Sequence, residues 1–531
     1  MLRVRGLGLR PGEDKPQKLK KAAANVLGVP ISEITELTPV RRSIDARDRD
    51  YIRILYTVDV SLPNEANVLR AVGERAFPAP ELRFALPRPE RAPDQRPMVV
   101  GFGPAGMFIA LVLAEAGLRP IVLERGLPVE ERTEKIRLFR KDGLLDPSCN
   151  VQFGEGGAGT FSDGKLNTGI GGSEVEWVLR RLVEFGAQKR ILWDAAPHVG
   201  TDVLTGVVKN LRQRVLSLGG EIRFSTRLTD VEISGGVLRS VTAETCGNTE
   251  QFPCGEVFLA TGHSARDTTE MLYDHCIPME PKPFAMGVRI EHLQRELDRA
   301  QYGKWAGHPQ LGAAPYKLSV HLPDGTGVYT FCMCPGGYVM AAASEECGVV
   351  TNGMSYSGRA GENGNSALLV SLAPRQFPEK DALGGMRWQR SLERSAFTLG
   401  GCGYAAPVQR LGDFLERRTT VGFGEVRPTY TPGVRAVDLD RLLPSVITDS
   451  LRTAVPMLGR RLRGFDDPDA VLTAPETRSS SPVRILRDDD RQVPGVSGLY
   501  PCGEGAGWSG GIVSSAVDGI RSAAAYLSTL R

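Results

Sequence analysis

Apolar and polar residues alternate in short runs through the first part of the chain, and stretches with helical spacing separate these runs. Residues 50–62 alternate as a strand does, whereas residues 13–28 have the spacing of an amphipathic helix and close on a glycine. A proline-rich, charged segment at 86–97 then interrupts both patterns. These features predict a small α/β domain over residues 1–95 that ends in a linker, and a ferredoxin-like βαββαβ order is one arrangement that fits.

Buried strands and longer helices dominate the next region. An apolar strand at 98–100 leads through a glycine turn into an apolar helix and a second strand at 120–124, which together make a βαβ unit. Further helices and strands follow, among them one continuous strand at 221–233. They predict the first part of a three-layer, Rossmann-type domain with a mostly parallel sheet over residues 96–282.

Residues 283–480 have a different sequence pattern, in which glycine and proline frequently interrupt strand-like runs. In one of them, Pro335-Gly336-Gly337 predicts the turn of a β-hairpin between residues 327 and 344. We expect a β-rich substrate or cap domain inserted into the Rossmann-type domain. Residues 481–531 return to a strand, a glycine loop and a helix, and are expected to complete that domain. The predicted fold class is therefore α/β.

Composition narrows the possible partners. The 531 residues carry a formal net charge of +3, which gives no general case for binding nucleic acid or an anionic membrane. The apolar run at 98–124 is long enough to suggest a membrane span, but its turn glycines and proline argue against one. No signal-peptide pattern opens the chain, so we expect a cytoplasmic protein. The nine cysteines show no paired metal-ligand spacing, which predicts free thiols and no metal site, and the oligomeric state stays open.

A glycine fingerprint lies at the start of the Rossmann-type domain. Gly101, Gly103 and Gly106 form GxGxxG between a strand and a helix, and Glu124 ends the second strand. The first glycine permits a tight turn, the second lets the backbone approach a pyrophosphate, and the third lets helix and strand pack closely. The free N–H groups of the helix N-terminus favour phosphate, and the carboxylate suits ribose hydroxyls. The fingerprint predicts a dinucleotide site but does not by itself separate NAD from FAD.

Three further features favour FAD. Ala260-Thr261-Gly262 ends one strand, Gly503-Glu504 ends the last strand, and a glycine-rich loop at 154–169 follows the fingerprint by about 50 residues. The sequence has no second fingerprint of this kind. NAD(P)H is therefore expected as a transient electron donor, if it binds at all.

The glycine-rich loop also contains most of a nucleoside-triphosphate phosphate loop, Gly159-x-x-x-x-Gly164-Lys165. The next residue is Leu166, which lacks the hydroxyl that would hold magnesium. The segment before the loop is a poor strand and the one after it is no helix. We therefore disfavour an ATPase.

From about residue 97 to the end, the chain resembles the two-domain FAD-dependent dehydrogenases of the glutathione-reductase-like superfamily. It is most similar to a bacterial family known mainly as FAD-dependent dehydrogenases or NAD(P)/FAD-dependent oxidoreductases. The matching sequence motifs are GFGPAG, GEGGAGTFSDGKLNTG, FAMGVRIEH, GVYTFCMCPGG, TNGMSYSGR, ETRSSSPVRI and GEGAGWSGGIVSSAVDG. The resemblance implies an FAD cofactor and leaves the substrate undefined.

The resemblance also implies a set of cofactor contacts. Those to the pyrophosphate are Gly101, Gly103, Pro104, Ala105 and Gly106. Those to the adenosine part are Glu124, Arg125 and Leu228. Those to ribitol and isoalloxazine are Gly157, Ala158, Gly159, Thr160, Glu504, Gly511 and Ile512. Further candidates at strand ends are Thr261, Gly262 and Gly503. The superfamily more often has Asp at the position of Glu504, which puts the reach of this side chain in doubt.

Two residues are candidate catalytic groups. Lys165 would lie near flavin N5 or a substrate, or else is a solvated loop lysine. Arg478 would clamp a substrate carboxylate or stabilise reduced flavin, or else forms a loop salt bridge. His263, directly after Gly262, stands where a flavin contact is plausible. Cys332 and Cys334 stand one residue apart on an expected strand, and we favour structural over redox-active thiols.

These features predict an FAD-dependent oxidoreductase that passes a hydride or an electron pair between flavin N5 and a small organic substrate. Alternatives are a flavin monooxygenase, a non-catalytic FAD-binding scaffold, and an RNA-linked FAD-dependent modification protein. The last rests on a basic helix at residues 15–21, for which we favour the simpler interpretation of a solvated helix face. Nucleic acid is therefore the less favoured partner.

Overall fold

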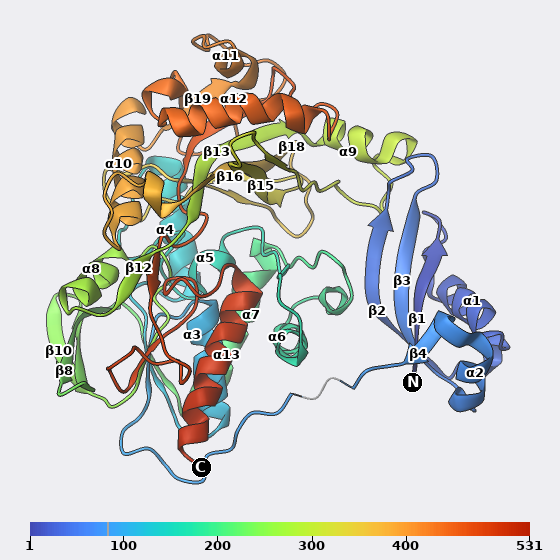
Figure 1. Cartoon of the computed structure of the whole chain (residues 1–531), viewed down its shortest axis with the longest axis horizontal. Coiled ribbons are helices and arrows are strands. Elements are labelled where there is room, and N and C mark those ends of the chain that lie inside the picture. The colour runs from blue at the N-terminus through green and yellow to red at the C-terminus, as the bar shows by residue number, and fades with distance from the viewer. Residues whose placement is uncertain (82–83) are drawn as a thin grey trace.

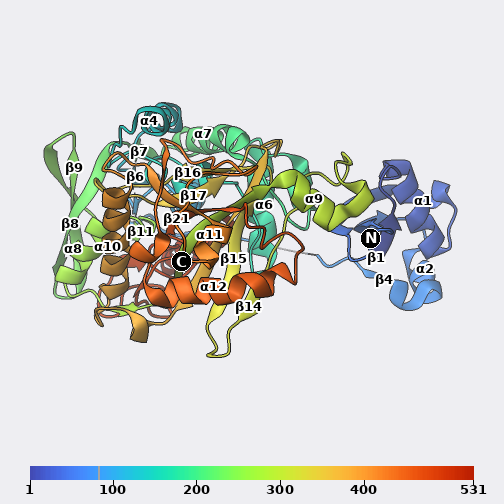
Figure 2. The same ribbon diagram turned by 90° about the horizontal axis from the view of Figure 1, so that it is seen from above.

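The computed structural model describes residues 1–81 and 84–531. Residues 2–78 form a unit of their own at one end of the molecule (Figures 1 and 2). Its antiparallel sheet has the order β2-β3-β1-β4, and α1 and α2 complete the βαββαβ order. The elements are β1 (Leu2–Leu9), α1 (Pro16–Leu27), β2 (Glu36–Asp45), β3 (Arg53–Ser61), α2 (Glu65–Val72) and β4 (Ala76–Pro78).

A second sheet is parallel throughout and has the order β23-β11-β5-β6-β7. Its strands are β5 (Met98–Val100), β6 (Ile121–Leu123), β7 (Glu221–Arg223), β11 (Val257–Leu259) and β23 (Leu499–Pro501). This sheet confirms the α/β class with a parallel sheet. The chain reaches its last strand only after a long excursion through the rest of the molecule.

The apolar run at 98–124, whose length suggested a membrane span, forms β5, α3 (Pro104–Glu115) and β6 in the interior. α3 is buried from Ala105 to Ala114 and packs against α13 (Ile512–Thr529) and α7 (Thr201–Ser217). Burial on all sides explains why the helix is apolar all round. Among the described residues, no helix has the length and apolarity needed to cross a membrane.

The expectation of one continuous strand at 221–233 is wrong. The chain breaks after β7 at Ser225, which has φ 53°, and β8 (Thr226–Ser234) joins a separate antiparallel sheet with β9 (Val237–Thr245) and β10 (Asn248–Pro253). The amide of Ser225 donates to the carbonyl of Gly126 at 2.9 Å. This distant partner fixes the break, which strand propensity does not reveal.

A seven-stranded sheet forms the core of the region after residue 283. Its order is β14-β15-β18-β13-β21-β19-β20, antiparallel except at β19–β20. The strands are β13 (Phe284–Leu293), β14 (Ser319–His321), β15 (Gly327–Cys334), β18 (Asn363–Leu372), β19 (Ala406–Arg410), β20 (Val434–Ala436) and β21 (Val471–Glu476). The main helices here are α9 (Gln294–Tyr302), α10 (Gly384–Leu399), α11 (Leu411–Leu415) and α12 (Ser445–Gly459). An antiparallel pair, β12 (Met279–Pro281) and β22 (Val483–Ile485), joins the chain where it enters and leaves this region.

The predicted hairpin across Pro335–Gly337 is also wrong. β15 pairs with β14 and β18, whereas β16 (Tyr338–Ala341) pairs with β17 (Thr351–Met354) in another sheet. The turn bonds to other elements instead, because Gly336 N–H donates to the Gln294 side chain and Gly337 N–H to the carbonyl of Asn363, both at 2.8 Å. The strands on either side therefore diverge.

Candidate functional site

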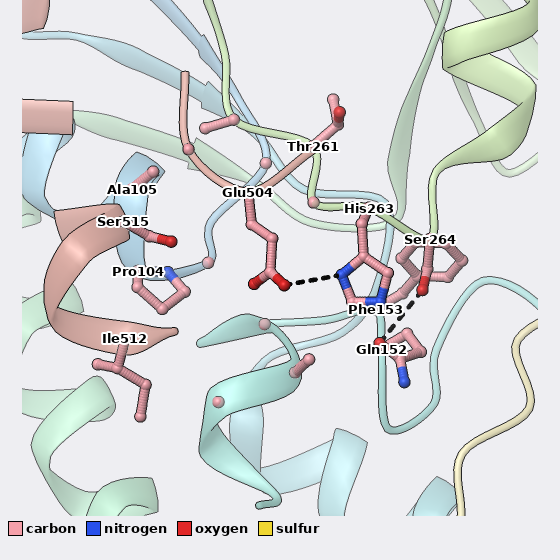
Figure 3. Close-up of a pocket in the computed structure, with 18 of the residues that line it drawn as sticks. Pro104, Ala105, Gln152, Phe153, Thr261, His263, Ser264, Glu504, Ile512 and Ser515 are labelled. Carbon is pink, nitrogen blue, oxygen red and sulfur yellow. Dashed lines mark hydrogen bonds and ion pairs between the residues drawn. The ribbon is translucent and has the colours of Figure 1, made fainter. Parts of the chain in front are cut away.

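One cavity collects most of the predicted site residues. It lies where the β5–α3 turn, the loop at 152–165, the end of β11 and the β23–α13 turn meet (Figure 3). Its remaining wall comes from the end of β6, from β8 and β15, from Asn352 on β17 and from residues 476–479. The predicted residues that line it are Gly101, Gly103, Pro104, Ala105, Glu124, Arg125, Gly157, Ala158, Gly159, Lys165, Leu228, Thr261, Gly262, Arg478, Gly503, Glu504, Gly511 and Ile512.

Two predicted cofactor residues are not part of the cavity wall. A methyl group on Gly106 would overlap the carbonyl oxygen of Gly101, so this glycine serves the packing of α3 against the turn. Thr160 is 2% exposed, and its hydroxyl occupies the space that a side chain on Gly156 would need. Both residues therefore contribute to the packing behind the cavity lining.

The β5–α3 turn forms a cradle of backbone. Gly101 has φ 96°, a left-handed conformation that suits glycine, and a methyl group there would overlap the carbonyl of Ala260. No side chain caps α3, whose N-cap is Gly103 and whose first residue is Pro104. Its first N–H groups therefore remain available to an anion in the cavity. This arrangement fits a pyrophosphate.

Glu124 holds the cradle together. Its carboxylate accepts hydrogen bonds from the amides of Phe102 and Gly126 at 2.8 Å and of Gly154 at 3.0 Å. The side chain is 4% exposed. It joins three loops by these hydrogen bonds and also lines the cavity. Arg125 beside it donates to Asp267 at 2.8 Å and stacks on Phe153, with its guanidinium carbon 4.2 Å from the ring centre. An adenosine ribose would meet acceptors that are already fixed in place.

The N-terminus of α13 approaches the cavity beside two titratable groups. Glu504 accepts from the amide of Gly511, the N-cap of α13, at 3.5 Å, and burial raises the pKa of Glu504 to about 7. Figure 3 shows this carboxylate pointing toward the ring of His263, with 3.7 Å between Oε1 and Nδ1. Burial, followed by repulsion from Arg478, lowers the pKa of His263 to about 3. The imidazole is therefore neutral at physiological pH and can serve as a hydrogen-bond partner.

Lys165 bridges the glycine-rich loop and the β-rich region. Its ammonium donates to the carbonyl of Met333 on β15 and lies 3.5 Å from Oδ2 of Asp163. An isolated backbone bridge to His198 fixes the residue in place. The structure thus places Lys165 in the wall of the cavity with bonded partners.

Arg478 also lines the cavity, but nearly all its donors are bound. Its Nε and Nη2 donate to Glu393 at 3.0 and 2.7 Å, and Nη1 donates to the hydroxyls of Ser264 and Ser344. Glu393 also accepts hydrogen bonds from Arg266, the first residue of α8 (Arg266–Asp274). These bonds favour a positioning role for Arg478. Its action as a substrate clamp stays a prediction.

Further lining residues escaped sequence reasoning, because they belong to no fingerprint. Gln152 accepts from the hydroxyl of Ser264 at 3.2 Å, which links the glycine-rich loop to the strand end after β11 (Figure 3). Phe331 and Asp163 come from the β15 wall and the glycine-rich loop. Only the tertiary structure brings them together. Cys332 also lines the cavity, and all nine cysteines are free.

The comparisons with known proteins support the cofactor class. Residues 283–479 match the family described as "FAD-dependent protein, C-terminal domain-like", and residues 1–61 match a "Domain of unknown function (DUF8436)". The fold, the cavity and the first match define an α/β protein whose β-rich region is of the FAD-dependent protein type. Over 523 residues the chain is 43% identical to an uncharacterized protein of Clostridium beijerinckii, covering 98% of this chain and 97% of that protein. The chain therefore belongs to the same family as this protein.

Several solved structures align over most of the chain with low similarity. The flavin-dependent brominase Bmp2 is 10% identical, with 82% of this chain and 80% of that chain covered and a TM-score of 0.37. The E. coli quinol fumarate reductase FrdA is 12% identical, with 81% and 70% covered and a TM-score of 0.34. A geranylgeranyl bacteriochlorophyll reductase-like protein of Thermoplasma acidophilum is 12% identical, with 81% and 78% covered and a TM-score of 0.35.

Proposed function

We propose that this protein is an FAD-dependent oxidoreductase that passes a hydride or an electron pair between flavin N5 and a small organic substrate. The observation that carries the proposal is that the N-termini of two helices whose N-cap residue is glycine, α3 and α13, line the same cavity. Each presents free N–H groups and the positive end of a helix dipole. An elongated dinucleotide with a pyrophosphate at one helix and an electron-accepting ring at the other fits this pair.

The chain's own residues have distinct roles in this proposal. The β5–α3 turn binds the pyrophosphate, and Glu124 orients the adenosine ribose. The Gly157–Gly159 backbone and Glu504 position the ribitol side, and Ile512 excludes water from the ring. When bound, FAD would supply the hydride and electron transfer. Lys165 lies in the same wall and would bind or orient the substrate.

Reduction of the bound flavin tests the proposal. The purified protein, loaded with FAD under anaerobic conditions, is titrated with NADPH and then NADH while the visible spectrum is recorded, with dithionite as a control for reducibility. Bleaching by a nicotinamide that an added acceptor reverses would support an oxidoreductase with a transient NAD(P)H donor. If NAD(P)H fails, a panel of organic substrates is tested in the same way. A flavin that dithionite reduces but no nicotinamide or organic compound does would favour a non-catalytic FAD-binding scaffold.

A further inference from the structure

Two cationic side chains share one carboxylate, Asp163, in the wall of the cavity. Asp163 is 1% exposed, and its Oδ2 lies 3.5 Å from Nζ of Lys165 and 3.4 Å from Nη2 of Arg359. Its Oδ1 accepts from the hydroxyl of Ser355 and lies 3.5 Å from Nε2 of His198. Burial lowers the pKa of His198 to about 4, so this ring is neutral at physiological pH. One carboxylate therefore faces two permanent cations.

The neighbouring acid, Glu476, is paired with another cation. Glu476 also lines the cavity, but its Oε1 lies 3.1 Å from Nη1 of the fully buried Arg289 and the two neutralise one another. Arg359 and Arg289 do not line the cavity, so Lys165 is the cation of this group that a ligand in the cavity can reach. A positive charge that is partly removed from water attracts an anion more strongly than an exposed one does.

The ion network around Arg478 is balanced by contrast. Three arginines and three glutamates are joined there by contacts of 2.5–3.6 Å: Arg266, Arg390, Arg478, Glu270, Glu345 and Glu393. Its cations are therefore satisfied within the protein. Lys165, by contrast, shares its carboxylate partner Asp163 with Arg359.

The same wall offers a neutral donor and an apolar surface. Asn352 on β17 lines the cavity, and its Oδ1 accepts from the amide of Gly353 at 2.8 Å. Among the described residues, none accepts a hydrogen bond from its amide NH2 group. Phe331 on β15 lines the cavity with 44% of its surface exposed, which is high for a large apolar side chain. A ligand with an anionic end and an apolar body would satisfy all three features.

We propose that this wall is a substrate subsite for an organic acid, in which Lys165 binds the carboxylate and Phe331 contacts the apolar body. The proposal rests on the proposed function, because the substrate would lie beside the bound flavin. Lys165 is anchored by Met333 and Asp163, so its ammonium is positioned before the ligand arrives. Asn352 donates a second hydrogen bond to the carboxylate. Arg359 shares Asp163 with Lys165, so this carboxylate compensates the charge of Lys165 only in part.

Binding of simple acids to the FAD-loaded protein tests this subsite. Benzoate, benzamide and acetate are titrated at one fixed pH, followed by the flavin difference spectrum and by isothermal titration calorimetry. Benzoate is expected to bind saturably and to perturb the flavin spectrum, whereas the uncharged benzamide is not. Lys165→Gln is expected to weaken benzoate binding by roughly 10- to 100-fold, the range for a lost hydrogen bond to a charged group. Phe331→Ala should weaken benzoate more than acetate.

Two matched variants separate this result from misfolding. Lys165→Arg keeps a cation and should restore part of the benzoate affinity, while Lys317→Gln removes an exposed lysine away from the cavity and should change nothing. FAD-loaded wild type that binds no carboxylate, or Lys165→Gln that binds benzoate as wild type does, would overturn the subsite. A protein that takes up no flavin would instead contradict the proposed function, and calorimetry would still report whether benzoate binds.

Discussion

Replacing Glu393 with glutamine would remove a buried negative charge that two arginines share. The side chain is 2% exposed and accepts from Arg266 at 2.8 Å twice, from Arg478 at 2.7 and 3.0 Å, and from the hydroxyl of Thr477 at 2.7 Å. Glutamine has the same shape but presents an NH2 donor to guanidinium donors. Breaking such a buried pair costs about 3–5 kcal/mol, because an uncompensated charge stays buried.

The loss should be visible as a lower melting temperature. For a unit of 150–250 residues, each kcal/mol lowers Tm by about 2–4 °C, so Glu393→Gln should melt roughly 6–20 °C below wild type. Differential scanning calorimetry at neutral pH measures the shift. Glu379→Gln is the matched control, because Glu379 is 56% exposed and its pair with Arg387 is worth only about 0–1 kcal/mol.

The pH dependence follows from the same contacts. Burial opposes the charge on Glu393, but the two arginines outweigh it and hold its pKa well below the usual range. The ionised carboxylate therefore stabilises the fold above the unfolded-state pKa of about 4.3, and this stabilisation is lost as pH falls below that value. The gap between wild type and Glu393→Gln should stay constant from pH 6 to 8 and shrink in acid. If Glu393→Gln had the same melting temperature as Glu379→Gln at neutral pH, this reasoning would be refuted.

Three further substitutions probe the cavity. Burial raises the pKa of Glu504 to about 7, so the stability of wild type should fall as pH rises from about 4.5 to 7. Glu504→Gln should become more stable relative to wild type over this window, which thermal unfolding of the flavin-free proteins at pH 5, 6.5 and 8 would measure. Parallel curves of melting temperature against pH for the two proteins would contradict this expectation. Gly103→Ala places a methyl group in the cradle 3.6 Å from Cα of Gly157, and should weaken FAD binding by about 1–3 kcal/mol in a flavin titration while the flavin-free protein melts as wild type does. Gly106→Ala overlaps the carbonyl of Gly101 and should lower the melting temperature of the flavin-free protein; unchanged melting would show that the turn can move.

Local signals in the sequence predicted the end of the cavity that the β5–α3 turn forms. The fingerprint glycines are specified by their own backbone: Gly101 needs a left-handed φ, and Gly106 must lack a side chain. Both requirements concern residues that lie close together along the chain, so the sequence predicts them. The acid at Glu124 follows the same βαβ unit. What the sequence did not reveal is that this carboxylate also ties the glycine-rich loop to the turn.

The other end of the cavity depends on residues far apart in the chain. Lys165 bonds to a carbonyl 168 positions away, and Arg478 bonds to a carboxylate 85 positions away. Neither partner is signalled by spacing, which is why the roles of both residues stayed open in the sequence. The wrong hairpin has the same cause, since Gly337 bonds to Asn363 and not across its own turn. Long-range pairing overrode a local turn signal at that point.

Identification of the chromophore comes first among the experiments. The purified protein is denatured, and the released cofactor is identified by mass spectrometry and quantified against protein. One FAD per chain is the expected result, either as purified or after incubation with FAD. A protein that purifies without flavin and takes up none would contradict the assignment of the cavity between α3 and α13 as an FAD site.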